Sequence, residues 1–211
     1  MDSIFKERKA RLGRSAAVAA VVIALAVASM VAGAPEDAHG GKTSLLIIDV
    51  QQFYFPGGFM PLEKPEAASA NCKRLIEKFR GENAMIVHVG HNASQDRAFH
   101  PDVTPLQGEK VFFKDEVSAF NGTELLPYLR ENGVERLVIC GMMTHMCVEA
   151  AVRAAHDLGF ECVLVEDACA TRDVKYGENT ITAADVHLST LGTVDKTYAT
   201  VVGTETFLEK Y

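Results

Sequence analysis

The sequence is organised around Leu137-Val138-Ile139-Cys140-Gly141-Met142-Met143-Thr144-His145-Met146-Cys147. Its first four residues are apolar and predict a buried strand. Thr144 is a favourable N-cap residue, so a helix is predicted to begin near Thr144. Cys147 would then lie in the first turn of that helix, where the helix dipole favours a thiolate over a thiol. The alternative is a buried cysteine that only contributes to packing, because free cysteines are among the most buried residues.

The length and the N-terminus suggest one domain behind a targeting segment. With 211 residues, of which 48% are hydrophobic, the chain is large enough for one substantial α/β core. Basic residues dominate the first 14 positions, and an uncharged run rich in alanine and valine fills residues 16–34. This layout is typical of a signal peptide, with cleavage expected near residue 28, and predicts a periplasmic or secreted protein. Membrane anchoring by an uncleaved segment is the alternative, because about 20 apolar residues can span a bilayer.

Charge and cysteine content limit the possible partners. The net charge of −7 argues against nucleic acid as a partner. Five cysteines are an odd number, so at least one is expected to stay unpaired in an oxidising compartment; whether the others form disulfides is left open. No C-x-x-C pair or other metal-ligand spacing is present. The cysteines are Cys72, Cys140, Cys147, Cys162 and Cys169.

Two further predicted strands end in charged residues. The apolar run at 45–48 does not alternate with polar residues, as expected of a central parallel strand, and Asp49 follows it. The short predicted strand Val111-Phe112-Phe113-Lys114 ends in a cation. The carboxyl ends of parallel strands meet at one edge of a sheet. We therefore expect Asp49, Lys114 and Cys147 to lie together as a base, a cation and a nucleophile.

The order of the predicted elements indicates an α/β fold. Predicted strands alternate with helices, including one that starts at Pro65 and one at 178–195, which favours right-handed crossovers and a doubly wound parallel sheet. The polar stretch at 92–109 is predicted to be a long loop. No G-x-G-x-x-G follows the first strand, so a dinucleotide cofactor is not indicated.

Several segments, in this order along the chain, resemble the isochorismatase-like cysteine hydrolase superfamily, which includes nicotinamidases, isochorismatases and carbamoylsarcosine amidases. The resemblance covers residues 43–208, which we expect to form the hydrolase domain. The matching segments are Leu46-Ile47-Ile48-Asp49-Val50-Gln51, Phe55-Pro56-Gly57-Gly58, Lys114 with Ser118-Ala119-Phe120, Gly141-Met142-Met143-Thr144-His145-Met146-Cys147-Val148, Asp167-Ala168 and Ala184-Asp185-Val186-His187.

The resemblance implies a three-layer Rossmann-like fold, with a six-stranded parallel sheet in the order 3-2-1-4-5-6 and helices on both faces. It implies Asp49, Lys114 and Cys147 as a catalytic triad. It also implies a cis peptide bond before Met143, with the backbone N–H groups of Met143 and Cys147 forming an oxyanion hole. In that order the third strand lies two places from the first, about 10 Å away. The backbone after Phe113 is therefore expected to bend toward the site.

The presence of Cys147 favours a cysteine hydrolase that cleaves a C–N bond of a small amide, lactam, ureido or carbamoyl substrate through a thioester. The alternatives are an isochorismatase-type vinyl ether hydrolase, which does not need the thiol, and a non-catalytic binding protein on the same fold. Nicotinamidases carry an Asp-x-His metal pair soon after the Pro-Gly-Gly motif, where this chain has Pro61-Leu62-Glu63. No metal and no cofactor are therefore expected.

The remaining expectations concern the pocket and the assembly. A small-molecule substrate and a homo-oligomer are expected from the resemblance. Each candidate pocket residue could equally be a core or subunit-contact side chain. These candidates are Gln51, Phe53, Phe55, His91, His145 and His187.

Overall fold

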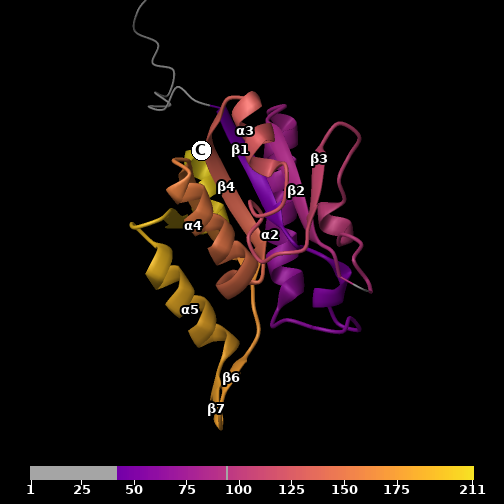
Figure 1. The fold of residues 1–211 in the computed structure, drawn as a ribbon, viewed down its shortest axis with the longest axis vertical. Coiled ribbons are helices and arrows are strands. Elements are labelled where there is room, and N and C mark those ends of the chain that lie inside the picture. Colours follow the sequence, from indigo (N-terminus) through magenta and orange to yellow (C-terminus); the bar gives the residue numbers. More distant parts are fainter. Residues whose placement is uncertain (1–41, 94) are drawn as a thin grey trace, which may run out of the picture. The chain divides into compact units, whose positions relative to one another are not determined.

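The computed structural model describes residues 42–93 and 95–211. In this part of the chain six parallel strands form one sheet in the order β3-β2-β1-β4-β5-β8, and β6 pairs with β7 in a separate antiparallel hairpin (Figure 1). The predicted order 3-2-1-4-5-6 is confirmed, because β8 is the sixth strand of the large sheet along the chain. The strands are β1 (Lys42–Ile48), β2 (Met85–His91), β3 (Lys110–Lys114), β4 (Val134–Met142), β5 (Glu161–Ala170), β6 (Val174–Tyr176), β7 (Asn179–Ile181) and β8 (Thr200–Val202).

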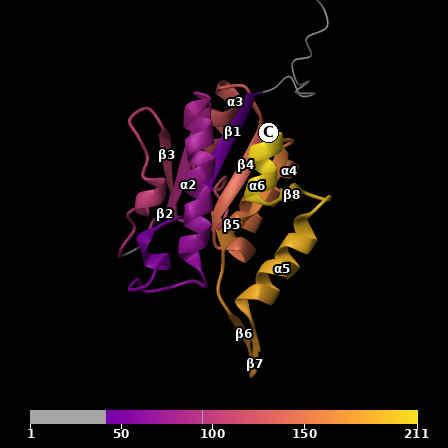
Figure 2. The same ribbon diagram turned by 180° about the vertical axis from the view of Figure 1, so that it is seen from behind.

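Helices cover both faces of the sheet, as expected. Helices α2 and α6 pack on one face, and α3, α4 and α5 lie on the other (Figures 1 and 2). The helices are α2 (Pro65–Gly81), α3 (Leu125–Glu131), α4 (Glu149–Asp157), α5 (Ala183–Val194) and α6 (Thr204–Lys210), with short 3-10 turns η1 (Gln52–Tyr54) and η2 (Pro101–Val103) and a π-helical turn η3 (Thr144–Val148).

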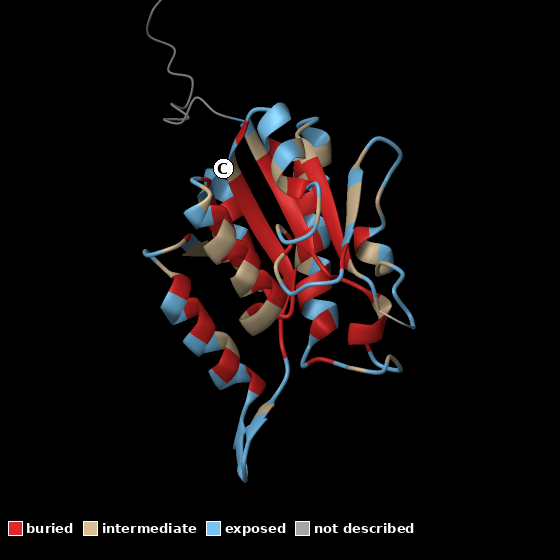
Figure 3. Ribbon diagram, viewed as in Figure 1, coloured by how far each residue is buried: buried red, intermediate tan, exposed pale blue. Residues whose placement is uncertain are grey.

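Strand β1 is central, with β2 on one side and β4 on the other. Its side chains alternate between the two faces of the sheet. Leu45 and Ile47 therefore belong to the core under α2, while Leu46 and Ile48 belong to the core under α3 and α4. All four side chains are fully buried (Figure 3). Burial on both faces explains why this run has no polar alternation.

The segment at 178–195 differs from the single helix that was predicted. Its first residues form strand β7, and α5 begins only at Ala183. The start of α5 is set by Thr182, whose Oγ1 accepts a hydrogen bond from the Asp185 N–H at 3.2 Å. The hairpin β6–β7 is mostly exposed and extends away from the sheet (Figures 1 and 3).

The predicted signal peptide or anchor at residues 1–34 lies outside the described residues. Export therefore stays a prediction. Among residues 42–93 and 95–211, none of the helices has the length and apolar character needed to cross a membrane.

Candidate active site

Three strand ends bring a carboxylate, an ammonium and a thiol together. Lys114 Nζ lies 2.8 Å from Asp49 Oδ2 and 3.3 Å from Cys147 Sγ. The side chains of Asp49 and Lys114 are completely buried, and Cys147 is 5% exposed. A buried ammonium is stable only when it is paired. The expected grouping of an acid, a cation and a thiol is therefore present in the structure.

Lys114 reaches the site without the backbone bend that was expected. It is the last residue of β3 and still pairs with His91 of β2. The Asn92 N–H donates to the Lys114 carbonyl at 2.9 Å, which holds the end of β3 against β2. The lysine and aspartate side chains extend toward each other across the end of β2. Their combined length spans the two strand spacings, so the expectation of a bent backbone was wrong.

The backbone conformations of two residues shape the floor of the site. Asp49 has a φ of +50°, a left-handed conformation that aspartate adopts more readily than most residues. Its N–H donates to the Val89 carbonyl at 2.8 Å, so β1 remains attached to β2 at this point. Gly141 has a φ of +130°, and a Cβ atom there would lie 2.0 Å from the Ile48 carbonyl oxygen. Only glycine lets β4 approach β1 this closely just before the turn that carries Cys147.

The turn between β4 and α4 is a π-helical turn, η3, that places Cys147 in its fourth position. The predicted N-cap was wrong by one residue. Met143 occupies the cap position and Thr144 is already helical, with its hydroxyl directed to His187 instead of the helix end. The peptide bond between Met142 and Met143 is cis.

The electrostatic environment of Cys147 differs from the expected one. Burial, together with the charge of Asp49, raises the pKa of the Cys147 thiol to about 12, although the Lys114 ammonium acts in the opposite direction. Burial also raises the pKa of the Asp49 carboxyl, while Lys114 lowers it. The expectation that the helix end favours a thiolate was wrong, because desolvation and a neighbouring carboxylate outweigh the dipole. The raised pKa favours a neutral thiol, which lies beside the paired Asp49 and Lys114 side chains.

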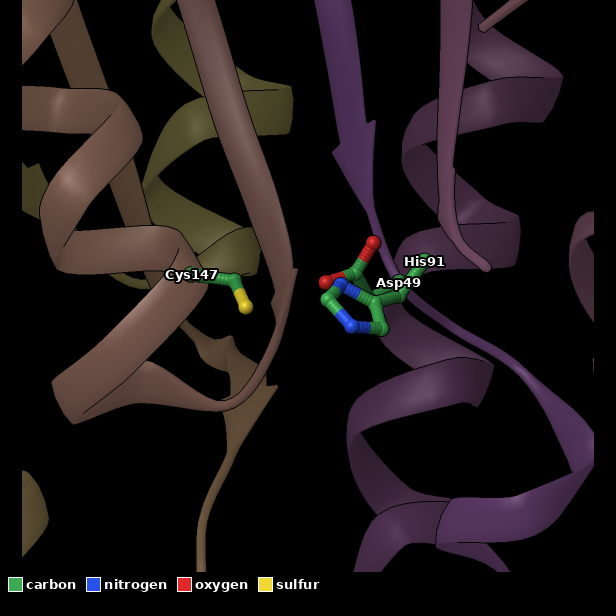
Figure 4. A group of neighbouring side chains, drawn as sticks. All are labelled: Asp49, His91 and Cys147. Atoms are coloured by element: carbon green, nitrogen blue, oxygen red, sulfur yellow. The ribbon is translucent and has the colours of Figure 1, made fainter. Parts of the chain in front are cut away.

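His91 completes the group. Its Nδ1 lies 3.0 Å from Lys114 Nζ and accepts from the ammonium. Asp49, His91 and Cys147 offer ligand atoms within 4.8 Å of one another, and Figure 4 shows the Cys147 side chain directed across the strand ends toward the other two. The Lys114 ammonium lies within 3.3 Å of an atom of each residue, so a metal ion held by these donors would lie close to a positive charge. This repulsion opposes metal binding while Lys114 is present.

Three of the candidate pocket residues have structural partners. The Gln51 amide donates to the His91 and Arg97 carbonyls at 3.1 and 2.6 Å and accepts from the His91 N–H at 2.7 Å. It therefore joins the ends of β1 and β2 to the following loop. Phe53 and Phe55 are almost fully buried and belong to the core under α2. All three residues therefore have structural roles: they support the site and are not shown to line a substrate pocket.

Two residues that were not predicted from the sequence, Tyr54 and Arg172, contribute to the electrostatics around the site. Burial raises the pKa of the Tyr54 hydroxyl, and the neighbouring Cys147 and Asp49 groups raise it further, whereas Arg172 lowers it. Burial and the charge of Arg172 also lower the pKa of His145. Tyr54 is the one polar side chain in an aromatic run, which is the only signal that could have identified it. Arg172 is exposed and lies next to the end of β5.

The two other candidate histidines connect the turn η3 to neighbouring elements: His145 belongs to the turn and contacts the residue after β5, and His187 belongs to α5 and contacts the turn. His145 Nδ1 lies 2.6 Å from Thr171 Oγ1, and His187 Nδ1 lies 2.9 Å from Thr144 Oγ1. An open groove of about 240 Å³ lies between the start of α2, the end of β5 and the start of α5, and includes Thr171 and His187 in its lining. None of the three proposed triad residues lines this groove. All five cysteines are buried and unpaired.

Comparison with known proteins identifies the family. A family model described as the isochorismatase domain matches residues 43–196. The uncharacterized isochorismatase family protein YddQ of Bacillus subtilis is 41% identical over 178 residues, covering 79% of this chain and 99% of that protein. The crystal structure of an isochorismatase from Pseudomonas putida is 36% identical, with a TM-score of 0.74, and the match covers 78% of this chain and 89% of that one. Maleamate amidohydrolase of Pseudomonas putida is 28% identical over 189 residues, covering 77% of this chain and 84% of that protein. The resemblance seen in the sequence is thus confirmed, and the chain belongs to the isochorismatase family of hydrolases.

Proposed function

We propose that the protein is a cysteine hydrolase that cleaves a C–N bond of a small amide, lactam, ureido or carbamoyl substrate. The observation that carries this proposal is the contact of one buried ammonium with both a carboxylate and a thiol, in Asp49, Lys114 and Cys147. A thiol that is neutral at rest needs a base beside it when it attacks, and Asp49 is placed to act as that base.

In the proposed reaction Asp49 takes the proton of Cys147 while the sulfur forms a bond to the carbonyl carbon. The developing oxyanion is received by the backbone N–H groups of Met143 and Cys147. Asp49 then gives the proton to the leaving nitrogen as the C–N bond breaks, which leaves a thioester. Water attacks the thioester, with Asp49 again taking a proton, and the C–S bond breaks as the thiol is restored. Lys114 keeps the charge of the carboxylate balanced throughout.

Two observations narrow the substrate class. The related maleamate amidohydrolase is named for the hydrolysis of an amide, which supports cleavage of a C–N bond by this protein. Arg172 is exposed, and its charge acts on both Tyr54 and His145 beside the thiol. A guanidinium in that place favours substrates that carry a carboxylate besides the scissile group.

The test is turnover of a substrate panel by the native protein and by Cys147→Ala. The panel contains amides, lactams, ureido acids and isochorismate, each acid with an uncharged ester or amide analogue. We expect hydrolysis of a C–N bond, with a preference for the acid, and a loss of several orders of magnitude in Cys147→Ala. Trapping of a thioester on Cys147 by mass spectrometry gives a direct check. Absence of turnover across the whole panel would favour a non-catalytic binding protein.

Hydrolysis of a vinyl ether is the second candidate. It is supported by the 36% identity to an isochorismatase of known structure. That chemistry requires proton transfer and does not need the thiol. If Cys147→Ala keeps turnover of isochorismate while Asp49→Asn loses it, the vinyl ether reaction takes first place.

We also propose that the protein is exported and forms a homo-oligomer. The signal-like composition of residues 1–34 supports export, and N-terminal sequencing of the processed protein should return a start near residue 29. Exposed apolar side chains around the hairpin support a subunit contact, with Tyr176 81%, Ile181 44% and Leu188 69% exposed. Light scattering coupled to gel filtration measures the assembly, and a monomeric mass would contradict the proposal.

A further inference from the structure

Two hydrogen bonds hold the turn that carries Cys147, one from α5 and one from the residue that directly follows β5. Thr144 Oγ1 lies 2.9 Å from His187 Nδ1, and His145 Nδ1 lies 2.6 Å from Thr171 Oγ1. Thr144 and His145 are consecutive residues of the turn, shortly before the cysteine. Thr144 is completely buried and Thr171 is 3% exposed, so water competes little for either hydroxyl.

The turn is a π-helical turn, η3, whose N-terminus has no side-chain cap and whose last residue leads directly into α4. The N–H groups of Met146 and Val148 both donate to the Met143 carbonyl, at 3.1 and 3.3 Å. A π-turn is wider than an α-helical turn and is frequent at functional sites. Side-chain contacts from outside the turn therefore add to these backbone hydrogen bonds at the uncapped end, where Thr144 and His145 lie.

Both outside partners are themselves held in place. The carbonyl of Thr171 accepts a hydrogen bond from the Glu63 N–H at 2.9 Å, which joins it to the segment before α2. His187 lies in α5, whose first residue, Ala183, donates its N–H to Asp173 Oδ1 at 2.8 Å. A fixed partner can set the position of the turn, whereas a mobile one could not.

We propose that His187 and Thr171 are positioning residues, which hold the turn so that Cys147 keeps its contact with Lys114. Neither belongs to the group of reacting atoms. The expected effect of the two residues on turnover rests on the proposed function. Their expected effect on the position and alkylation rate of the Cys147 thiol does not. Productive attack requires close alignment, and a displacement of about 1 Å can cost about 100-fold in rate. Loss of either hydrogen bond should therefore lower kcat more than it changes KM.

The first test compares His187→Ala with His187→Asn. The asparagine amide can occupy the place of Nδ1, so it should restore most of the activity that alanine loses. We expect His187→Ala to lower kcat about 100-fold, with KM within about twofold of the native value. The matched control is Thr190→Val, because Thr190 is a buried hydroxyl of the same helix that bonds only to the Val186 carbonyl within the helix. It should leave kcat unchanged, and thermal unfolding should show all three variants folded.

A double-mutant cycle with Thr144→Val separates positioning from general packing. If His187 acts through Thr144, the double variant should be no slower than the slower single variant. If the two single substitutions instead reduce kcat by factors that multiply in the double variant, His187 does not act through Thr144. Thr144→Ser retains the hydroxyl and should stay close to the native rate, so the cycle remains interpretable even if the valine variant is poorly folded. Thr171→Ser and Thr171→Val repeat the comparison at the second hydrogen bond.

The second readout needs no substrate. Alkylation of Cys147 by iodoacetamide, followed by mass spectrometry at pH 9, reports on its contact with Lys114. Because the ammonium lowers the pKa of the thiol, loss of the contact should slow alkylation, by about tenfold for each unit by which the pKa rises. Slower alkylation in His187→Ala and an unchanged rate in Thr190→Val would support the proposal.

The outcomes distinguish this inference from the proposed function. An unchanged alkylation rate and an unchanged kcat in His187→Ala would overturn the positioning role, even if Cys147→Ala is inactive. Conversely, if Cys147→Ala keeps full turnover, the proposed hydrolase mechanism fails. Slower alkylation in His187→Ala would still show that the helix α5 residue positions the thiol.

Discussion

The Lys114 ammonium lies 2.8 Å from the Asp49 carboxylate, although strand β2 separates the strands from which the two residues come. Both side chains are completely buried. The lysine extends across the end of β2, where His91 Nδ1 accepts from it at 3.0 Å. The site therefore contains its own fixed cation beside both the carboxylate and the thiol.

Asp49→Asn should change turnover and thiol reactivity in opposite directions. Turnover should fall by several orders of magnitude, because the base is lost. The charge of Asp49 raises the pKa of Cys147, so its removal lowers that pKa and leaves Lys114 beside the thiol. Below the pKa, alkylation by iodoacetamide should then accelerate about tenfold for each unit by which the pKa falls. Mass spectrometry at pH 8 measures the rate on Cys147, with the four other buried cysteines as internal references. Slower alkylation would contradict the assigned electrostatics.

Lys114→Met should destabilise the protein, because it leaves the Asp49 carboxylate buried without a partner. Breaking one side of a buried ion pair typically costs about 3 to 5 kcal/mol in the free energy of unfolding. Combining it with Asp49→Asn removes both charges and should recover most of this loss. Lys110→Met, at an exposed lysine of the same strand, is the control and should change stability by about 1 kcal/mol or less. Urea denaturation at pH 7 compares the native protein, Lys114→Met, the double variant and Lys110→Met. Equal losses of unfolding free energy in Lys114→Met and in the double variant would argue against a stabilising Asp49–Lys114 ion pair.

Activity should not require a metal ion. The only cluster in the described residues with three close ligand atoms is Asp49, His91 and Cys147, and the Lys114 ammonium lies within 3.3 Å of an atom of each. Two cations cannot share that place without a large repulsion. Dialysis against a strong chelator should leave kcat and KM unchanged. A loss of activity that Zn²⁺ or Mn²⁺ restores would show that this arrangement rearranges to admit a metal.

A second, partly buried network should determine the stability of the loop before β3. Glu109 accepts hydrogen bonds from Arg80 at 2.7 and 2.9 Å, and it also pairs with His88 Nε2 and the Leu106 N–H, each at 2.9 Å. Burial raises the pKa of Glu109, but these partners outweigh burial and lower the pKa from 4.5 to about 2. When the pKa of a carboxyl is lower in the folded protein than in the unfolded chain, the group adds stability at a pH above its unfolded-state pKa. This stability is lost as the pH falls through the folded-state pKa.

Glu109→Gln should therefore destabilise the protein by about 2 kcal/mol at pH 7. The difference from the native protein should shrink as the pH falls from 4.5 toward 2, because the native carboxylate becomes protonated there. Urea denaturation at pH 7, 4 and 2.5 measures this difference. A difference that stays constant with pH would show that side-chain shape, and not charge, explains the effect.

The sequence alone was sufficient to predict the central strand and the meeting of Asp49, Lys114 and Cys147 in space. A four-residue apolar run without alternation predicts burial on both faces, and Leu45 to Ile48 are fully buried. The three residues lie at or shortly after the ends of predicted strands, and parallel strands end at a common edge. These predictions depend on the order of residues along the chain, and the family motifs supplied the strand order.

Only the tertiary structure decided the state of the thiol and the partners of the turn. The pKa of Cys147 depends on burial and on Asp49, which is far away in the sequence, so the local helix position predicted the wrong direction. The contact of Thr144 with His187 and the placement of Tyr54 likewise depend on segments that meet only in the folded chain. Periodicity and capping are properties of neighbouring residues, whereas desolvation and charge–charge distances arise from packing between distant ones.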